Sequence, residues 1–173
     1  MDRQGLVMIF TGDGKGKTTA AVGLGVRAAG HDRRVLMIQF LKGSGRDYGE
    51  ARALQSLPSF RVARYGQGFV LGDPDEAHIR RAREGLARAR EAMAARECDL
   101  LILDEINVAI ACRLVRLEEV LDLLAGRPQD MDVVLTGRGA PRALMDQAHM
   151  VSDVQEVKHH YRTGVQAQAG VEF

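Results

Sequence analysis

The sequence predicts an α/β fold in which helices cover both faces of a mainly parallel sheet of about six strands. Short, continuous apolar runs recur along the chain, as is typical of strands that are buried on both faces. Segments with helical periodicity lie between these runs, and strands that are joined by helices pack in parallel. The length of 173 residues suits one domain with a substantial core, so we expect residues 1–173 to form a single domain.

The predicted strands are, in chain order, residues 6–10, 35–40, 60–64, 100–103, 133–136 and 150–157, and the third has the weakest pattern. The predicted helices are residues 17–29, 75–96 and 116–125. Asp73 is expected to cap the second helix, with Pro74 in its first turn and Glu76 after it. The apolar stripe of that helix is predicted to be Ala82, Leu86, Ala89 and Met93. Its arginines and glutamates are typical of a solvated face.

Composition and charge limit the possible functions. Hydrophobic residues make up 46% of the chain and charged residues 27%, and the formal net charge is +1, so neither nucleic acid nor a membrane is indicated as a partner. No apolar run approaches the length of a membrane span, and the N-terminus has no signal-peptide pattern, so we expect a cytoplasmic protein. Cys98 and Cys112 are expected to be reduced and buried, and they do not predict a zinc site.

The strongest functional signal is the glycine-rich loop at residues 11–18, with the sequence TGDGKGKT, between a predicted strand and a predicted helix. Such a turn exposes backbone N–H groups at the positive end of the helix, which suits a polyphosphate. Lys17 adds a positive charge, and Thr18 offers a hydroxyl to Mg²⁺. The sequence therefore predicts a single-domain P-loop (RecA-like) fold that binds ATP through Gly12, Asp13, Gly14, Lys15, Gly16, Lys17, Thr18 and Thr19.

The loop departs from the standard pattern, which is a glycine, four further residues and then Gly-Lys-Thr. Thr11 holds the position of the first glycine, and Gly12 stands one place late. Asp13 also puts a negative charge close to the expected phosphates. These differences predict a variant mode of phosphate binding.

Ligands of parallel sheets bind beyond the carboxyl ends of the strands, and further polar residues are expected there. Asp104 and Glu105 end the fourth strand and are predicted to hold Mg²⁺, although an acid that caps the next helix is an alternative. The sequence leaves open which of the two binds the ion directly. Arg138 follows the fifth strand and either reaches the nucleotide or lies in solvent, and Lys42 follows the second strand at the same edge.

The loop after the third strand, at 65–71, contains Phe69 and Leu71. These apolar side chains either meet an apolar substrate at the ligand edge or fold back onto the core, and the two alternatives weigh equally.

Several motifs, in order along nearly the whole chain, resemble those of the ATP:corrinoid adenosyltransferases, in the branch of that family with a phosphate loop. They are TGDGKGKTTAA at 11–21, QFLKG at 39–43, LDE at 103–105, LEEV at 117–120, TGRG at 136–139, VKH at 157–159 and GVQAQAGV at 164–171. The phosphate loop alone is shared by many families, whereas the tail and the shifted glycine together are specific to this one.

The resemblance implies alkyl transfer, in which the Co(I) of cobalamin or another corrinoid attacks the 5′-carbon of ATP and triphosphate leaves. It also implies that ATP lies in the loop in the reverse of the usual orientation. Lys17 and Arg138 would be the catalytic groups that stabilise the leaving triphosphate, with Mg²⁺ at Thr18 and at Asp104 or Glu105. Co(I) is already a powerful nucleophile, so the reaction needs no general base.

Further implications of the resemblance concern the corrinoid and the partners. The family displaces the lower axial ligand of cobalt with apolar and aromatic side chains, which stabilises a lower oxidation state. Phe69 matches the family's aromatic residue, whereas Leu71 stands where better-known members carry tryptophan. Those members also have a helical segment before the first strand, which here begins within a few residues of Met1. A reduced flavoprotein donor and a homodimer are implied as well.

Two other classes of function are alternatives. A small-molecule kinase would need a catalytic base and an arginine-rich lid over the γ-phosphate. A nucleotide-binding switch or a motor module would hydrolyse its nucleotide without any corrinoid. No Asn-Lys-x-Asp segment follows a predicted strand, so the sequence does not favour a guanine-specific switch.

Overall fold

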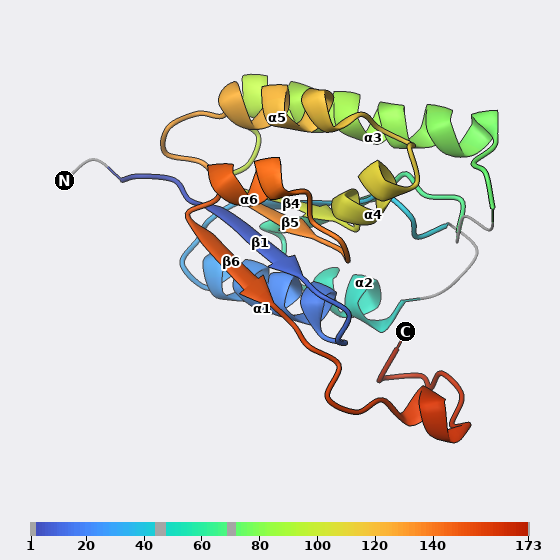
Figure 1. Cartoon of the computed structure of the whole chain (residues 1–173). Helices are drawn as coiled ribbons and strands as arrows, with labels where there is room; N and C mark the ends of the chain where they lie inside the picture. Colours follow the sequence, from blue (N-terminus) through green and yellow to red (C-terminus); the bar gives the residue numbers. More distant parts are fainter. Residues whose placement is uncertain (1–2, 44–47, 69–71, 173) are drawn as a thin grey trace.

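The structure, a computed structural model, describes residues 3–43, 48–68 and 72–172 (Figure 1). Within these residues, its centre is a six-stranded sheet in which all neighbouring strands are parallel, which confirms the predicted fold class. The order across the sheet is β3-β2-β4-β5-β1-β6, so β5 lies between β1 and β4. The strands are β1 (Val7–Thr11), β2 (Val35–Gln39), β3 (Phe60–Arg64), β4 (Leu100–Asp104), β5 (Asp132–Thr136) and β6 (Met150–Asp153).

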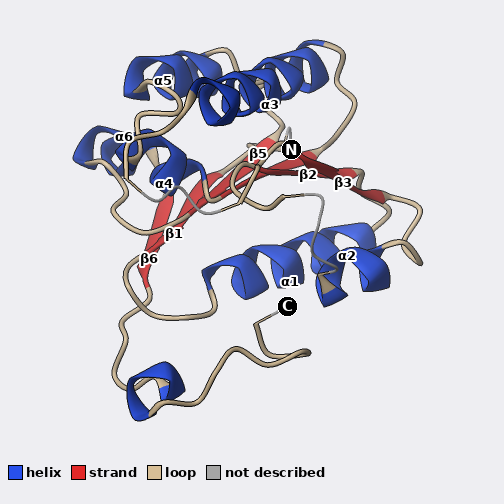
Figure 2. Ribbon diagram, turned by 90° about the vertical axis from the view of Figure 1, so that its right-hand side faces the viewer, coloured by secondary structure: helices blue, strands red, loops and turns tan. Residues whose placement is uncertain are grey.

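Helices cover both faces of the sheet (Figure 2). Helices α1 and α2 lie on one face, and α3 to α6 lie on the other. They are α1 (Lys17–Ala29), α2 (Gly49–Leu54), α3 (Glu76–Ala94), α4 (Ile106–Ala111), α5 (Leu117–Ala125) and α6 (Arg142–Gln147), and a 3₁₀ helix spans His160–Thr163.

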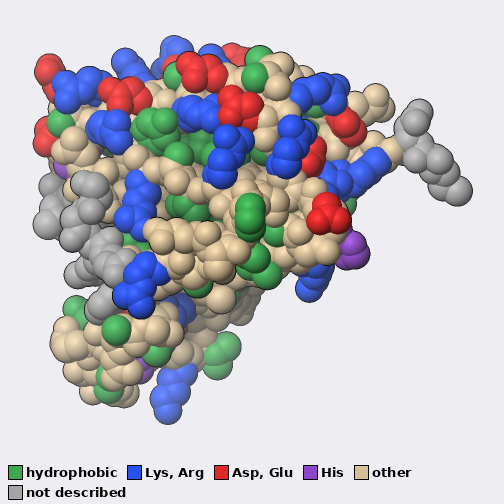
Figure 3. All heavy atoms as spheres, turned by 180° about the vertical axis from the view of Figure 1, so that it is seen from behind, with side chains coloured by type: hydrophobic (Ala, Val, Ile, Leu, Met, Phe, Trp, Pro, Cys, Tyr) green, Lys and Arg blue, Asp and Glu red, His purple; other side chains and the backbone are tan. Residues whose placement is uncertain are grey.

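Side chains alternate between two cores along each buried strand, since successive residues of a strand point to opposite faces. In β1, Met8 and Phe10 pack in the core that contains Ala21 of α1. Val7 and Ile9 pack in the larger core under α3 to α6. The buried residues of α3 include the whole predicted stripe, Ala82, Leu86, Ala89 and Met93. Figure 3 shows acidic and basic side chains interspersed over the outer layer of helices.

Some local predictions were wrong. The N-cap of α3 is Asp75 and not Asp73, because the Asp75 carboxylate accepts a hydrogen bond of 2.8 Å from the His78 N–H. Strand β6 ends at Asp153, before the predicted limit at 157. Both cysteines are free, but Cys112 is only half-buried. Helices α2, α4 and α6 were not predicted, because each has six residues, too few to show a helical period.

After β6 the chain leaves the sheet, and its last residues run along the outside near the start of α1 (Figure 1). Most side chains of this tail are exposed. None of the helices in the described part of the chain is long and apolar enough to cross a membrane.

Substitution of two glycines of α1 by alanine is predicted to change stability in opposite directions. A Cβ at Gly25 would lie 2.3 Å from the ring of Phe60, whereas a Cβ at Gly23 would meet nothing within 4 Å. We expect Gly25→Ala to lower the free energy of unfolding by about 1–3 kcal/mol through overpacking. Gly23→Ala, the matched control, should raise it by about 0.5–1 kcal/mol, because alanine favours the helix. Urea unfolding of both variants measures this, and equal effects would contradict the packing described here.

Candidate nucleotide-binding site

The loop at residues 11–18 connects β1 to α1 and is hydrogen-bonded to the segment that follows β6. The Gly14 N–H donates to the Val154 carbonyl (2.6 Å), and the Val154 N–H donates to the Thr11 carbonyl (2.9 Å). Gly12 has a φ of 90°, and a Cβ there would lie 2.1 Å from an oxygen of Asp153. The glycine at 12 is therefore required by a contact with β6, which the sequence alone could not reveal.

The first turn of α1 supplies free backbone donors. The Ala20 N–H is bonded to the Gly16 carbonyl, so the N–H groups of Lys17, Thr18 and Thr19 precede the first helical hydrogen bond. Together with the positive end of the helix dipole, these donors suit an anion. The Gly14 amide, which we expected to face phosphate, is instead bonded to Val154.

The Lys17 ammonium folds back over its own loop and donates to the Gly14 carbonyl. The residue is 7% exposed. Burial lowers the pKa of Lys17 below its ordinary value, and the positive charge of Arg138 acts in the same direction, while Glu105 opposes both. The structure thus brings Lys17, Glu105 and Arg138 within electrostatic reach of one another.

Three polar side chains form a row across neighbouring strands on the side of the sheet that faces α1. Gln39 and Asp104 are paired in the register of β2 and β4, and Thr136 is the last residue of β5. Asp104 is fully buried, and its Oδ1 accepts hydrogen bonds from the hydroxyls of Thr18 (2.8 Å) and Thr136 (2.9 Å). Its Oδ2 accepts from Gln39 Nε2 (3.1 Å). Asp104 and Thr18, two predicted metal ligands, are therefore in direct contact.

Lys42 lies between two carboxylates. Its Nζ is 2.7 Å from Glu50 Oε1 and 3.4 Å from Asp104 Oδ2, and it lies over the ring of Tyr48. Burial opposes the charged form, but the carboxylates of Asp104 and Glu50 outweigh burial and hold the pKa of Lys42 above its ordinary value. Sequence reasoning did not identify Glu50. The sequence offered only an acidic residue in a six-residue segment, which is too short to be recognised as a helix.

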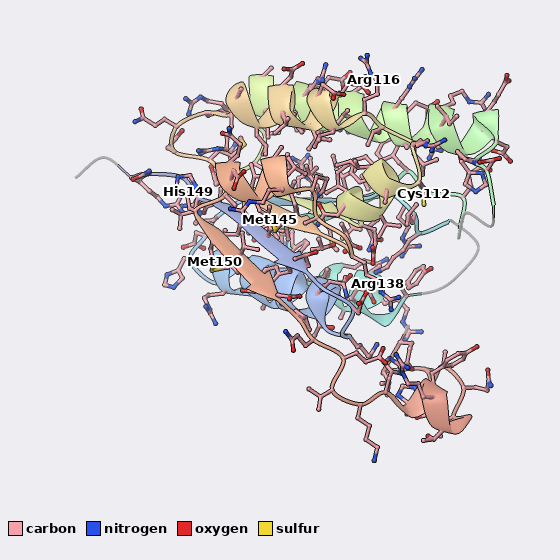
Figure 4. The ribbon with its side chains drawn as sticks, in the orientation of Figure 1. Cys112, Arg116, Arg138, Met145, His149 and Met150 are labelled. Atoms are coloured by element: carbon pink, nitrogen blue, oxygen red, sulfur yellow. The ribbon has the colours of Figure 1, made fainter. Side chains whose placement is uncertain are left out.

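Glu105 follows Asp104, and its N–H donates a hydrogen bond of 2.9 Å to the Thr136 hydroxyl. Its backbone is left-handed, with φ 64°, and its Oε2 lies 3.2 Å from where a Cβ of Gly137 would stand. Burial raises the pKa of Glu105, and the charge of Asp104 raises it further. Arg138 is exposed in the same loop as Gly137, at the carboxyl edge of the sheet (Figure 4).

The remaining predicted residues fall into two groups. Asp13 and Lys15 are exposed, and the Lys15 ammonium lies 3.5 Å from a carboxylate oxygen of Glu172 in the tail. Phe69 and Leu71 lie outside the described residues.

Comparisons with known proteins show the family to which the chain belongs. The sequence model of a family described as ATP:corrinoid adenosyltransferase BtuR/CobO/CobP matches residues 3–173. The corrinoid adenosyltransferase of Escherichia coli K12 is 37% identical over 174 residues, which cover 99% of this chain and 87% of that protein. The corrinoid adenosyltransferase CobA of Salmonella typhimurium is 36% identical, with the same coverage.

Solved structures match the fold at low sequence identity. A KaiC-like protein from Pyrococcus horikoshii has a TM-score of 0.58 at 18% identity, covering 90% of this chain and 74% of that one. The flagellar accessory protein FlaH of Methanocaldococcus jannaschii has a TM-score of 0.57 at 15% identity, covering 86% and 70%. These likenesses agree with the predicted RecA-like fold.

The Lys42–Glu50 pair predicts a pH-dependent contribution to stability. Lys42 holds the pKa of Glu50 below its ordinary value of 4.5, against the effect of burial. The stability that this pair adds is therefore present above that value and is lost as the pH falls through the lowered pKa of the folded state. Near neutral pH we expect Glu50→Gln to lower the free energy of unfolding by about 1 kcal/mol. This is the contribution of a hydrogen bond between charged groups, reduced because the pair is partly exposed.

Urea unfolding at neutral and acidic pH measures this contribution, with the exposed Glu91→Gln as the control. The difference between wild type and Glu50→Gln should shrink below pH 4.5. A difference that does not depend on pH would show that the ion pair is not its source.

Proposed function

The chain belongs to the ATP:corrinoid adenosyltransferase family, and on that premise we propose how its site transfers the adenosyl group of ATP to a corrinoid. The observation that carries the proposal is the contact between the phosphate loop and the buried acid of β4, where the Thr18 hydroxyl donates to Asp104. This contact supports the proposal that a metal-bound triphosphate binds at the carboxyl edge of the sheet. Family membership favours alkyl transfer over the kinase and switch alternatives.

The reaction needs one bond to form and one to break. The Co(I) corrinoid donates an electron pair to the 5′-carbon of ATP, and the bond from that carbon to the triphosphate oxygen breaks. The electron pair of that bond leaves with triphosphate, so negative charge grows on the leaving group. Catalysis then depends on stabilising that charge and on holding the 5′-carbon in line with cobalt.

The residues around the loop are suited to this task. The amides of Lys17, Thr18 and Thr19 supply donors to the phosphates, and the ammonium of Lys17 supplies charge from inside the loop. The guanidinium of Arg138 is a second charge at the same edge. Lys17 must leave the Gly14 carbonyl to meet the triphosphate. We assign both side chains to the stabilisation of the leaving group.

The Thr18 and Asp104 oxygens fit Mg²⁺, a hard cation that is held by one or two carboxylates together with substrate phosphates and water. Both oxygens are hard donors and lie 2.8 Å apart. We propose that Thr18 and Asp104 hold the ion, with Glu105 in support. Bound Mg²⁺ would supply positive charge to the triphosphate oxygens.

Other parts of the proposal come from the family or from the sequence alone. We propose that Phe69 and Leu71 contact the lower face of the corrinoid, and that a reduced flavoprotein supplies electrons. A homodimer, a cytoplasmic location and one domain over residues 1–173 complete the proposal.

The direct test supplies the purified protein with ATP, Mg²⁺ and chemically reduced cob(I)alamin. We expect the absorbance spectrum to become that of adenosylcobalamin, with one triphosphate released per cobalt–carbon bond. Appearance of ADP without a cobalt–carbon bond would contradict the proposal.

Variants of the charged groups test their assigned roles. Lys17→Ala should lower kcat by about 100- to 1,000-fold, as the loss of a group that stabilises transition-state charge does. Asp104→Asn should raise the Mg²⁺ concentration needed for half-maximal activity, and it should weaken Mn²⁺ binding measured by electron paramagnetic resonance in the presence of ATP. The exposed Arg83→Ala is the control and should match wild type. Normal Mn²⁺ binding in Asp104→Asn would remove Asp104 from the metal site.

A further inference from the structure

Thr11 occupies the position that a standard phosphate loop gives to glycine, and its side chain has a specific contact. Thr11 is the last residue of β1 and is 8% exposed. Alternation along β1 puts its side chain on the face of Val7 and Ile9, opposite to the face that carries Asp104. Its Oγ1 accepts a hydrogen bond of 3.1 Å from the Ala140 N–H, which is 129 residues away in the sequence. A glycine at this position could not make that bond.

Ala140 ends the loop that carries Arg138, and the beginning of the loop is held as well. Asn107 of α4 is fully buried, and its Nδ2 donates to the Gly137 carbonyl (3.1 Å). The Gly137 N–H donates to the Phe10 carbonyl (3.2 Å).

Close packing adds to these hydrogen bonds. A Cβ at Gly137, whose φ is 124°, would lie 3.1 Å from Asn107 Cβ and 3.1 Å from the Val108 nitrogen. Gly139 also has a positive φ, of 66°. Hydrogen bonds thus hold the backbone on both sides of Arg138, while its side chain is exposed at the carboxyl edge of the sheet.

We propose that Thr11 and Asn107 are positioning residues that hold Arg138 in place to meet the leaving triphosphate. This inference rests on the proposed function, because it needs Arg138 to act on that group. An arginine on a free loop would have to lose backbone entropy as charge develops, whereas a fixed one has lost it during folding. The threonine in place of glycine therefore serves the arginine loop of β5, and the phosphates are held by the amides and by Lys17.

A double-mutant cycle separates this role from a merely structural one. Thr11→Val keeps the shape of the side chain but removes the acceptor, and Thr11→Ser keeps the hydroxyl. We expect Thr11→Val to lower kcat by about 3- to 10-fold with little change in KM for ATP, as the loss of one hydrogen bond in the transition state would do. Thr11→Ser should restore most of that loss, and Arg138→Ala should lower kcat by more than Thr11→Val does.

The decisive result is the double variant Thr11→Val/Arg138→Ala. If Thr11 acts through Arg138, the double variant should be no slower than Arg138→Ala alone. Circular dichroism and thermal melting confirm that each variant is folded. The proposal would be overturned if the two substitutions lowered kcat independently, so that their effects multiply in the double variant. It would also be overturned if Thr11→Val were as fast as wild type.

The outcome also separates this proposal from the proposed function. A wild-type protein that forms no cobalt–carbon bond would contradict the proposed function itself. An Arg138→Ala variant with normal kcat in an active enzyme would remove only the role of the arginine, and with it the role of Thr11.

Discussion

The site depends on one fully buried carboxylate, that of Asp104. A buried charge is costly unless hydrogen bonds and opposite charges surround it. Asp104 has such partners from four places in the chain: Thr18 at the start of α1, Gln39 at the end of β2, Thr136 at the end of β5, and Lys42 in the loop after β2. Satisfying this one charge therefore fixes the phosphate loop, the sheet edge and, through Glu50, helix α2 relative to one another.

The two faces of the sheet edge carry different parts of the site. The face toward α1 holds Asp104 with Thr18, which we propose as the metal site. The opposite face, at the end of β1, holds the Thr11 hydroxyl and through it the loop of Arg138. A triphosphate in the loop at 11–18 would then lie between two positive charges, the proposed metal ion and the guanidinium of Arg138. The alternation of side chains along parallel strands produces this division.

The sequence was sufficient for the parts of the structure that rest on local patterns. Continuous apolar runs located β1, β2, β4 and β5, and weaker patterns located β3 and β6. The glycine-rich turn between a strand and a helix located the phosphate loop. The short helices α2, α4 and α6 were missed because six residues give less than two helical turns. The cap of α3 was placed at Asp73 because Pro74 follows it, as is typical of the first turn of a helix. Asp75 is an equally suitable acid two residues later, and only its hydrogen bond with His78 distinguishes the two.

The contacts between distant segments could not be predicted from the sequence. The shifted glycine at 12 was interpreted as a variant mode of phosphate binding, whereas its close contact is with Asp153, at the end of β6. The partners of Thr11 and Lys42 likewise became visible only once the order of the strands was known. The roles of the site residues in the reaction remain predictions.

The most direct measurement is a crystal structure of the protein with ATP, Mg²⁺ and a Co(II) corrinoid, which cannot react. We expect the triphosphate on the amides of residues 17–19, the metal ion at Thr18 and Asp104, and the 5′-carbon turned toward cobalt. A metal ion away from Asp104, or a γ-phosphate in place of the 5′-carbon facing the corrinoid, would contradict it.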